Sequence, residues 1–474
     1  MNLKNLLKKK IHFVGIGGIG MSGLARILLA RGCRVSGSDV KRSSLIDRLQ
    51  KEGAEIAIGH RKENIRDADV LVYSSCIPSE NPERIEGGER RLEILSRGEL
   101  LSRLFQEKKV RIAVSGSHGK TTTTAMTAYL LEQAGCHPVF LIGGISRNLG
   151  VNGGDGEGDY FVAEADESDG SFLALSPTLS VVTNMDAEHL DYYKTHERSL
   201  EAYAAFLEHT EQKGKVFVSS DCPHTAGILK KLRHPHPVTF GFSPDADIRP
   251  DRITKGQGTL QFDVFRRGTK LGTFRLHLSG RHNIANALGV IAVGMECGIP
   301  LSAIQQGLED FRGVERRLDV REFPSLTIVE DYAHHPTEIK ATLAAVRDLV
   351  NGRRVVGVFQ PHRYSRTQLL AKEFGRCFGD LNILLMTEIY ASSEEPIPDV
   401  DAETLLREVR QVEKGKEVRF VPKQKILSHL SGLLRPEDVL VVLGAGDINE
   451  VARELAVQCS QGHLPWMNKP EGTL

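Results

Sequence analysis

The chain has 474 residues, with 40% hydrophobic and 26% charged residues, a balance typical of soluble globular proteins with buried cores. This length is too great for one ordinary domain and predicts about two to four. Lysine plus arginine equals aspartate plus glutamate, at 61 residues each, so the overall charge favours neither nucleic acid nor an anionic membrane as a partner.

The N-terminal segment carries a glycine-rich loop between a strand and a helix. Ile11–Val14 is predicted as a buried strand, and it runs into Gly15–Gly20, which has the pattern G-x-G-x-x-G. A second strand is predicted at Arg34–Gly37, with Asp39 at its end. Glycines let the backbone turn sharply and approach a diphosphate held by a helix N-terminus. The loop therefore predicts a site for NAD or another diphosphate, although a strand–helix turn without a ligand has the same pattern.

A second glycine loop gives a stronger signal. The predicted strand Arg111–Ser115 leads directly into Gly116–Thr122, with the sequence GSHGKTT, and a helix follows. Backbone N–H groups of such a loop cradle the phosphates of ATP, with Lys120 at the β and γ oxygens and a threonine hydroxyl on Mg²⁺. Val114 stands where the general P-loop has its first glycine. This is therefore a shortened P-loop.

Acidic side chains follow two further predicted strands. Tyr160–Ala163 ends in Glu164–Asp169, and Leu179–Thr183 ends in Asn184–His189. Residues at the carboxyl ends of parallel strands face the ligand crevice of an open sheet. We expect at least one of these side chains to bind Mg²⁺, while most of the others are solvated or cap helices.

The rest of the chain completes an α/β pattern. Residues Leu260–Leu278 alternate apolar and polar around a turn at Arg267-Gly268, which predicts an antiparallel hairpin, and Asn283–Met295 is predicted as a helix. A third α/β unit contains predicted strands at Leu326–Val329, Arg354–Phe359, Asn382–Met386 and Asp438–Leu443. The predicted fold is α/β with three domains: a Rossmann-like domain at 1–107, a P-loop domain with a small antiparallel element at 108–314, and a Rossmann-like domain at 315–474.

With these motifs in order, the sequence resembles the Mur ligases, which build the peptide of the peptidoglycan precursor. The motifs that carry the resemblance are the GSHGKTT loop, Glu164–Phe172 (EADESDGSF), Asp186–Asp191, His282–Asn286, Arg316-Arg317, Asp331–Pro336 (DYAHHP), Phe359–Thr367 (FQPHRYSRT) and Gly444–Asp447. They span essentially the whole chain. Within the family, His12–Gly23, the EADESD run and Phe359–Arg363 are most similar to the member that adds L-alanine to UDP-N-acetylmuramate.

The resemblance implies an ATP-dependent and Mg²⁺-dependent acid–amino-acid ligase that forms an acyl phosphate, in cell wall synthesis and hence in cell shape and division. It reassigns the first glycine loop from NAD to the UDP end of a nucleotide sugar. By the resemblance, Lys120, Glu164 and His189 are catalytic, and Thr121, Glu164 and His189 bind the metal.

Further site residues are implied by position in the family motifs. The resemblance assigns to ATP Gly116, Ser117, His118, Gly119, Lys120, Thr121, Thr122, Asn283, Asn286, Arg317 and Asp331. It assigns to the UDP-sugar Gly15, Gly17, Gly18, Gly20, Met21, Ser22 and Asp39. It assigns to the amino acid Tyr332, His334, Arg363 and Arg366.

Three alternatives remain open from the sequence. One is a sibling ligase, such as the murein tripeptide recycling ligase or another Mur step. Another is an NAD-dependent oxidoreductase, which would leave the P-loop without a role, and the third is an ATP-hydrolysing switch.

The partners and the location are further expectations. We expect small-molecule substrates, no nucleic acid, no membrane, and a monomer or weak homodimer. The basic, polar N-terminus and the absence of an apolar run of about 20 residues predict a cytoplasmic protein. The seven cysteines lack a C-x-x-C pair, so we expect small buried side chains in a reducing compartment, with no disulfide framework or zinc site.

Overall fold

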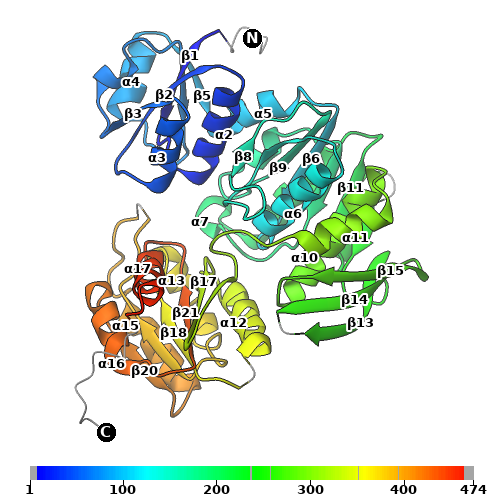
Figure 1. Cartoon of the computed structure of the whole chain (residues 1–474). Helices are drawn as coiled ribbons and strands as arrows, with labels where there is room; N and C mark the ends of the chain where they lie inside the picture. The colour runs from blue at the N-terminus through cyan, green and yellow to red at the C-terminus, as the bar shows by residue number, and fades with distance from the viewer. Residues whose placement is uncertain (1–7, 235–236, 257, 351, 393, 464–474) are drawn as a thin grey trace. The chain divides into compact units, whose positions relative to one another are not determined.

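The structure is a computed structural model that describes residues 8–234, 237–256, 258–350, 352–392 and 394–463. Its three sheets and their covering helices form two compact units (Figure 1). The first comprises the described residues of 1–254, 260–277 and 283–314, and the second those of 255–259, 278–282 and 315–474. Among the described residues, every helix is too short or too polar to span a bilayer.

The first sheet has the strand order β3-β2-β1-β4-β5, and all of its pairs are parallel. Its strands are β1 (Lys10–Val14), β2 (Arg34–Asp39), β3 (Glu55–Ile58), β4 (Val70–Tyr73) and β5 (Glu93–Ser96). The accompanying helices are α2 (Ile19–Ala30), α3 (Ser44–Lys51), α4 (Pro82–Glu89) and α5 (Arg97–Phe105), with a 3₁₀ turn at Lys62–Ile65. Parallel strands buried on both faces explain the near-continuous apolar runs of β1 and β4.

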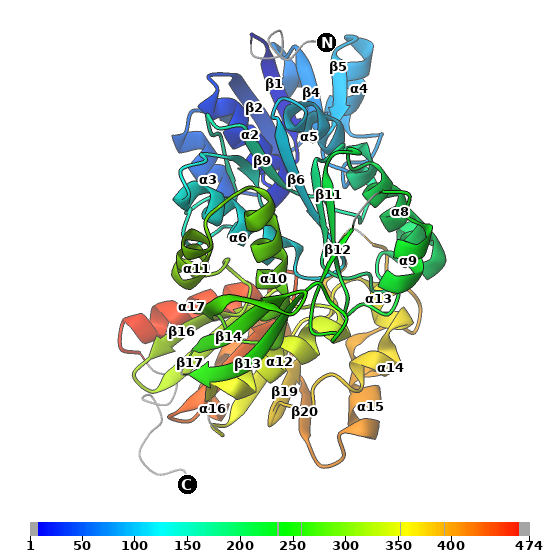
Figure 2. The same ribbon diagram turned by 90° about the vertical axis from the view of Figure 1, so that its right-hand side faces the viewer.

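The second sheet has ten strands in the order β15-β14-β13-β12-β11-β10-β6-β9-β7-β8. They are β6 (Val110–Ser115), β7 (Val139–Leu141), β8 (Gly153–Gly154), β9 (Tyr160–Glu164), β10 (Leu179–Val182), β11 (Lys215–Ser219), β12 (Val238–Phe240), β13 (Ile248–Gly256), β14 (Thr259–Arg266) and β15 (Thr269–Leu276). The helices are α6 (Lys120–Gln133), α7 (Leu190–Tyr193), α8 (His196–Glu208), α9 (Thr225–Lys231), α10 (Arg281–Glu296) and α11 (Leu301–Asp310), with a 3₁₀ turn at Ser171–Ala174. Helices α8 and α9 lie beside β11 and β12 (Figure 2).

The predicted hairpin is confirmed. Strands β14 and β15 pair antiparallel, and Arg267 and Gly268 between them have φ of +46° and +84°. Two consecutive left-handed residues match the twist of hairpin strands, which is why glycine follows a polar residue there.

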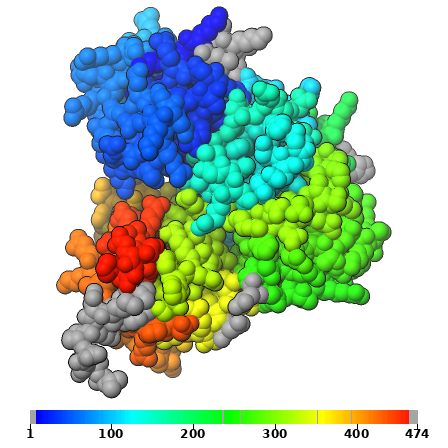
Figure 3. Space-filling view, in the orientation of Figure 1, coloured from blue at the N-terminus to red at the C-terminus, as the bar shows by residue number. Residues whose placement is uncertain are grey.

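One core runs through both sheets of the first unit. Helix α2 approaches β7 and β8 closely, because a Cβ on Gly23 would lie 2.4 Å from a methyl of Leu141. Asn152 also donates from Nδ2 to the carbonyl of Ile19 at 2.6 Å. In the space-filling view the blue residues of the first sheet and the cyan residues that begin the second are in contact (Figure 3).

The third sheet has the order β16-β17-β21-β18-β19-β20, and only its β16–β17 pair is antiparallel. Its strands are β16 (Asp319–Phe323), β17 (Leu326–Asp331), β18 (Val355–Phe359), β19 (Ile383–Met386), β20 (Glu417–Phe420) and β21 (Asp438–Leu443). Its helices are α12 (Pro336–Val350), α13 (Tyr364–Leu369), α14 (Ala371–Phe374), α15 (Ala402–Val412), α16 (Ile426–Leu433) and α17 (Asn449–Ser460), with a 3₁₀ turn at Lys423–Lys425. The predicted α/β class is confirmed, and β16 is an antiparallel addition that the sequence pattern does not predict.

The expectation that the cysteines are buried is only partly correct. Cys33, Cys222, Cys377 and Cys459 are buried, but Cys136 and Cys297 are half-buried and Cys76 is exposed. Cys76 lies in the turn after β4, where no sheet or helix covers it. All seven are free thiols.

Candidate active site

The shortened P-loop forms the predicted strand–loop–helix. Strand β6 ends at Ser115, and α6 begins at Lys120 after a loop in which Gly116 and Gly119 have φ of +129° and +81°. These backbone conformations favour glycine. A Cβ on Gly119 would lie 2.5 Å from Oδ1 of Asn286, so this asparagine of α10 lies directly against the loop.

Asn184, which follows β10, binds both backbone polar groups of one loop residue, His118. Its side-chain Oδ1 accepts from the His118 N–H at 2.9 Å, and its Nδ2 donates to the His118 carbonyl at 2.9 Å. Its own carbonyl accepts from the Ser117 N–H at 3.3 Å. The N–H groups of Ser117 and His118 both donate to Asn184. The backbone N–H groups that remain to bind a phosphate are therefore those at the start of α6.

Lys120 is held inside the loop by a buried carboxylate. Its Nζ donates to the carbonyl of Ser117 at 3.2 Å and lies 2.8 Å from Oε1 of Glu167, whose side chain is 2% exposed. Burial alone would lower the pKa of Lys120, but the carboxylates of Glu167 and Asp166 outweigh it and raise that pKa. The ammonium is therefore charged at neutral pH and suited to neutralise transferring phosphate.

Thr121 and Glu164 form a second group beside the loop. The Thr121 hydroxyl donates to Oε1 of Glu164 at 3.1 Å, and the Gly143 N–H donates to Oε2 at 2.7 Å. A Cβ on Gly143 would lie 2.4 Å from the same carboxylate, so only glycine leaves room for it. Hydroxyl and carboxylate oxygens are donors that Mg²⁺ prefers.

His189 lies in a neighbouring group. Its Nε2 is 3.5 Å from Oε1 of Glu167 and 3.7 Å from Oε2 of Glu188, so the three side chains could share one ion. His189 has φ of +55° at the start of α7, which directs the chain back from the strand end. The structure thus pairs Thr121 with Glu164, and it places His189 beside two carboxylates that were not singled out as metal ligands. Both donor sets fit a hard divalent cation.

The first glycine loop is stabilised by Asp39. The carboxylate oxygen Oδ2 of Asp39 accepts from the Gly17 N–H at 2.8 Å, and a Cβ on Gly17 would lie 2.8 Å from that oxygen. Met21 and Ser22 are each 1% exposed, and the Ser22 hydroxyl donates to the Ile19 carbonyl at 3.0 Å. The Ser22 hydroxyl also accepts from Nδ2 of Asn152 at 2.9 Å. Both side chains are therefore buried in the protein, and the part of this segment that can meet a ligand is the loop backbone at Gly15, Gly18 and Gly20.

In the second unit, aromatic and imidazole rings contact one another among the motif residues predicted to bind the amino acid. The rings of Tyr332 and His334 lie 5.4 Å apart, His334 and His362 lie 5.5 Å apart, and His362 stacks on Tyr390 at 5.6 Å. Arg366 places Nη1 3.1 Å from Nδ1 of His362. Burial, with further contributions from the nearby cations, lowers the pKa of His362 to about 2. This imidazole is therefore neutral, and its Nδ1 accepts from Arg366.

Arg363 precedes α13 with φ of +70°, a conformation that non-glycine residues rarely adopt. Its N–H donates to the Tyr390 carbonyl at 2.8 Å, which fixes this turn. Strain at an arginine is more often tolerated at functional sites than elsewhere. Arg363 and Arg366 thus start from one short helix beside His362.

Arg317 and Asp331 also lie near one another in the second unit. Arg317 lies over the Tyr332 ring at 4.9 Å, and its neighbours Arg316 and Leu318 have φ of +61° and +47°. Asp331 accepts from the N–H groups of Leu318 and Ala333, each at 2.7 Å, and therefore holds this turn in place. Burial raises the pKa of Asp331 to about 6.

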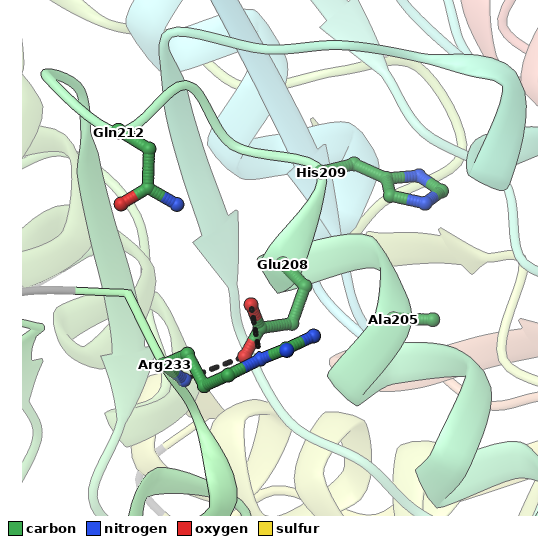
Figure 4. A pocket seen from close by; sticks show the side chains of 5 residues that line it. All are labelled: Ala205, Glu208, His209, Gln212 and Arg233. Carbon is green, nitrogen blue, oxygen red and sulfur yellow. Dashed lines mark hydrogen bonds and ion pairs between the residues drawn. The ribbon is translucent and has the colours of Figure 1, made fainter.

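An open hollow of about 620 Å³ lies elsewhere on the first unit, lined by Ala205, Glu208, His209, Gln212 and Arg233 (Figure 4). Glu208 and Arg233 point toward one another across it, and the Arg233 N–H donates to Oε1 of Glu208 at 2.6 Å. These residues belong to none of the groups described above, and the hollow adds nothing to the candidate site.

A P-loop with a charged lysine, carboxylates on two strand ends and a glycine loop at a parallel sheet defines a nucleotide-dependent transfer enzyme of α/β class. Three family models match the chain: Mur ligase family, catalytic domain, at residues 10–109, Mur ligase middle domain at 114–294, and Mur ligase, glutamate ligase domain, at 316–446. The chain belongs to the Mur ligase family.

Curated relatives cover nearly the whole chain. It is 43% identical over 456 residues to the UDP-N-acetylmuramate–L-alanine ligase of Anaeromyxobacter sp. (strain Fw109-5), covering 96% of this chain and 99% of the relative. It is 46% identical to the protein of the same name from Solidesulfovibrio magneticus, covering 94% and 96%.

Solved structures agree in fold. The UDP-N-acetylmuramate–alanine ligase of Thermotoga maritima has a TM-score of 0.82 at 28% identity, covering 96% of this chain and all of that one. A murein peptide ligase from Psychrobacter arcticus has a TM-score of 0.73 at 22% identity, covering 95% and 98%, which shows the fold alone.

Proposed function

We propose that this chain joins L-alanine to the lactyl carboxylate of UDP-N-acetylmuramate at the expense of ATP, in peptidoglycan precursor synthesis. The observation that carries the proposal is the charged Lys120 in its loop, beside two strand-end carboxylate groups, in a chain 43% identical over almost its full length to ligases of that name. In this proposal the domain at 1–107 binds the UDP-sugar, the domain at 108–314 binds ATP, and the domain at 315–474 binds the amino acid.

The first step is phosphoryl transfer. An oxygen of the lactyl carboxylate attacks the γ-phosphorus, the bond to the bridging oxygen breaks, and ADP leaves. Lys120 offsets the charge on the β and γ oxygens, and the N–H groups at the start of α6 hold them. Thr121, Glu164 and His189 would hold Mg²⁺, with Glu167 and Glu188 within reach of His189, and the ion would offset negative charge on the transferring phosphoryl group.

The second step is acyl transfer. L-alanine enters as an ammonium and first gives one proton to water. Its amine then attacks the carbonyl carbon of the acyl phosphate, inorganic phosphate leaves, and the nitrogen gives a second proton to water. Arg363 and Arg366 bind the alanine carboxylate, since two guanidinium groups offer paired N–H donors to it. Neutral His362 cannot repel the incoming ammonium, and Tyr332 and His334 line the same pocket.

The test is phosphate release by the purified chain with ATP, Mg²⁺ and UDP-N-acetylmuramate across a panel of amino acids. We expect release only when the nucleotide sugar and L-alanine are both present, and its loss in Lys120→Ala. Lys109→Ala is the matched control, because Lys109 is a surface lysine 79% exposed in an ion pair with Asp159.

Two results would contradict the proposal. Turnover with a tripeptide or D-glutamate in place of L-alanine would move the chain to a sibling ligase. Phosphate release that needs no amino acid would indicate an ATP-hydrolysing switch instead.

A further inference from the structure

Arg97 lies against the first glycine loop. It is the first residue of α5, whose N-terminus is fixed by a capping box between Ser96 and Glu99. A Cβ on Gly20 would lie 3.2 Å from Cδ and 3.5 Å from Nη1 of Arg97. The last glycine of the G-x-G-x-x-G loop therefore leaves room for this side chain, which is 14% exposed.

The position is electrostatically unusual for a cation. Gly20 is in the first turn of α2, where unpaired N–H groups and the helix dipole create a positive potential. A guanidinium beside that turn is disfavoured unless an anion lies near both. The N-terminus of α2 and the guanidinium of Arg97 together create a positive potential that attracts an anion.

The partners of Arg97 in the protein only partly satisfy it. Its Nη2 donates to the Ser171 hydroxyl at 3.1 Å and lies 3.6 Å from Asp169 and 3.8 Å from Asp166. Charge-assisted hydrogen bonds are shorter, at about 2.7–2.9 Å, and a guanidinium has five N–H donors. Within the described part of the chain, Ser171 is the only hydrogen-bond acceptor of this side chain, so donors remain for a ligand.

We propose that Arg97 binds the diphosphate of the nucleotide sugar, together with the backbone of the first glycine loop. This inference rests on the proposed function for the identity of the sugar nucleotide. Asp166 and Asp169 hold the guanidinium in place, and the incoming diphosphate accepts from its remaining N–H donors. Arg97 thus links the first glycine loop to the acidic run that begins at Glu164.

Binding of UDP and UMP to the full chain tests this, because UDP has the diphosphate and neither has the lactyl carboxylate. We expect Arg97→Gln to weaken UDP binding by about 10- to 100-fold, the effect of losing one charge-assisted contact, and to weaken UMP binding less than about threefold. Arg97→Lys should recover part of the UDP affinity. Arg103→Gln, on the same helix in an ion pair with Glu93 at 2.6 Å, should leave both unchanged.

Asp169→Asn separates ligand binding from a structural role. It removes a competing charge but keeps the oxygen that accepts from the Ser171 N–H at 3.0 Å. We expect UDP to bind this variant at least as tightly as the wild type. Weaker UDP binding in both Arg97→Gln and Asp169→Asn would make Arg97 a structural tether and overturn the inference.

The proposed function is tested separately, by measuring whether the wild-type chain ligates L-alanine. Unchanged UDP affinity in Arg97→Gln, in a chain that still ligates L-alanine, would overturn the inference and leave the function intact. If UDP binding depends on Arg97 but the wild-type chain does not ligate L-alanine, the inference stands and the proposed function is overturned.

Discussion

Nζ of Lys120 lies 2.8 Å from Oε1 of Glu167, and both side chains are buried, with 12% and 2% of their surfaces exposed. The P-loop lysine is thus paired with a carboxylate of the protein itself. A phosphate must therefore replace or share the Glu167 carboxylate. The pair connects the ATP loop to the acidic run, so stability and catalysis depend on the same contact.

Removing the lysine should separate these two roles. Lys120→Met leaves Glu167 buried without its cation, and we expect unfolding free energy to fall by about 3 kcal/mol, as for other broken buried pairs. Lys120→Met with Glu167→Gln should recover at least half of that loss. Both variants should lose at least roughly 100-fold in kcat, because neither restores positive charge at the phosphates.

Thermal or urea unfolding alongside phosphate release checks this prediction. Lys109→Met, in an exposed pair with Asp159, is the control and should shift stability by less than about 0.5 kcal/mol. A double variant no more stable than Lys120→Met would show that the pair does not account for the loss.

Asn184 should matter for ATP because it binds both the backbone N–H and the backbone carbonyl of His118 in the P-loop. Asn184→Ala removes two hydrogen bonds of 2.9 Å, and we expect KM for ATP to rise by roughly 10- to 100-fold as the loop loses its fixed shape. KM for the nucleotide sugar should change little.

The chain offers a matched control for this change. Asn148 similarly donates to the Asp310 carbonyl at 2.9 Å and accepts from the Arg312 N–H at 2.7 Å, and neither partner belongs to the P-loop. Asn148→Ala should therefore lower stability by a similar amount and leave KM for ATP unchanged. Equal effects of both variants on ATP would mean that Asn184 acts through general stability.

Much of the fold could be predicted because its signals are local. Buried strands such as β1 and β21 are short apolar runs, and the turn at Arg267-Gly268 specifies its hairpin through backbone conformation alone. Strand β16 could not be predicted. Its sequence DVREF has few apolar residues, and it forms because β17 offers a free edge.

The candidate site divides in the same way. The loop pattern predicts Lys120 at the phosphates and leaves Thr121 and Thr122 open as the metal ligand. Which acid lies beside which of these groups depends on how two strand ends turn. The family resemblance singles out Glu164, whereas the structure also brings Glu167 to Lys120 and His189. His362 lies within the FQPHR motif, but the structure was needed to show its ring contact with His334 and its contact with Arg366.

Arg366 should determine affinity for the amino acid. Arg366→Met removes a guanidinium proposed to bind the alanine carboxylate, and we expect KM for L-alanine to rise by about 10- to 100-fold, the value of one or two charge-assisted hydrogen bonds. The KM of Arg366→Lys for L-alanine should lie between those of the wild type and Arg366→Met, since lysine keeps the charge but not the planar guanidinium. Initial rates at varied L-alanine, with ATP and nucleotide sugar saturating, measure this.

Arg410→Met is the control for that series, because Arg410 forms an exposed ion pair with Glu403 at 2.7 Å in the same unit. It should leave KM for L-alanine unchanged. A rise in KM for ATP rather than L-alanine in Arg366→Met would instead assign this arginine to the nucleotide.

Asp331 should make stability depend on pH in an unusual direction. Burial raises its folded-state pKa from 3.8 to about 6, so the folded chain retains a proton that the unfolded chain releases. The proton-bound state stabilises the fold below pH 3.8, and this contribution is lost as pH rises to about 6. The interval corresponds to roughly 3 kcal/mol, most of it lost between pH 4 and 6. An ordinary salt-bridged aspartate would show the opposite slope.

Asp331→Asn removes the titration while keeping one oxygen for the N–H groups of Leu318 and Ala333. We expect the variant to be less stable than the wild type at pH 4, because it loses an acceptor, and the difference to shrink or reverse by pH 7. Urea unfolding of both proteins from pH 4 to 7 measures the difference, in which titrations common to the two cancel. A difference that stays constant, or grows with pH, would mean that Asp331 is ionised throughout and that its two backbone contacts outweigh its burial.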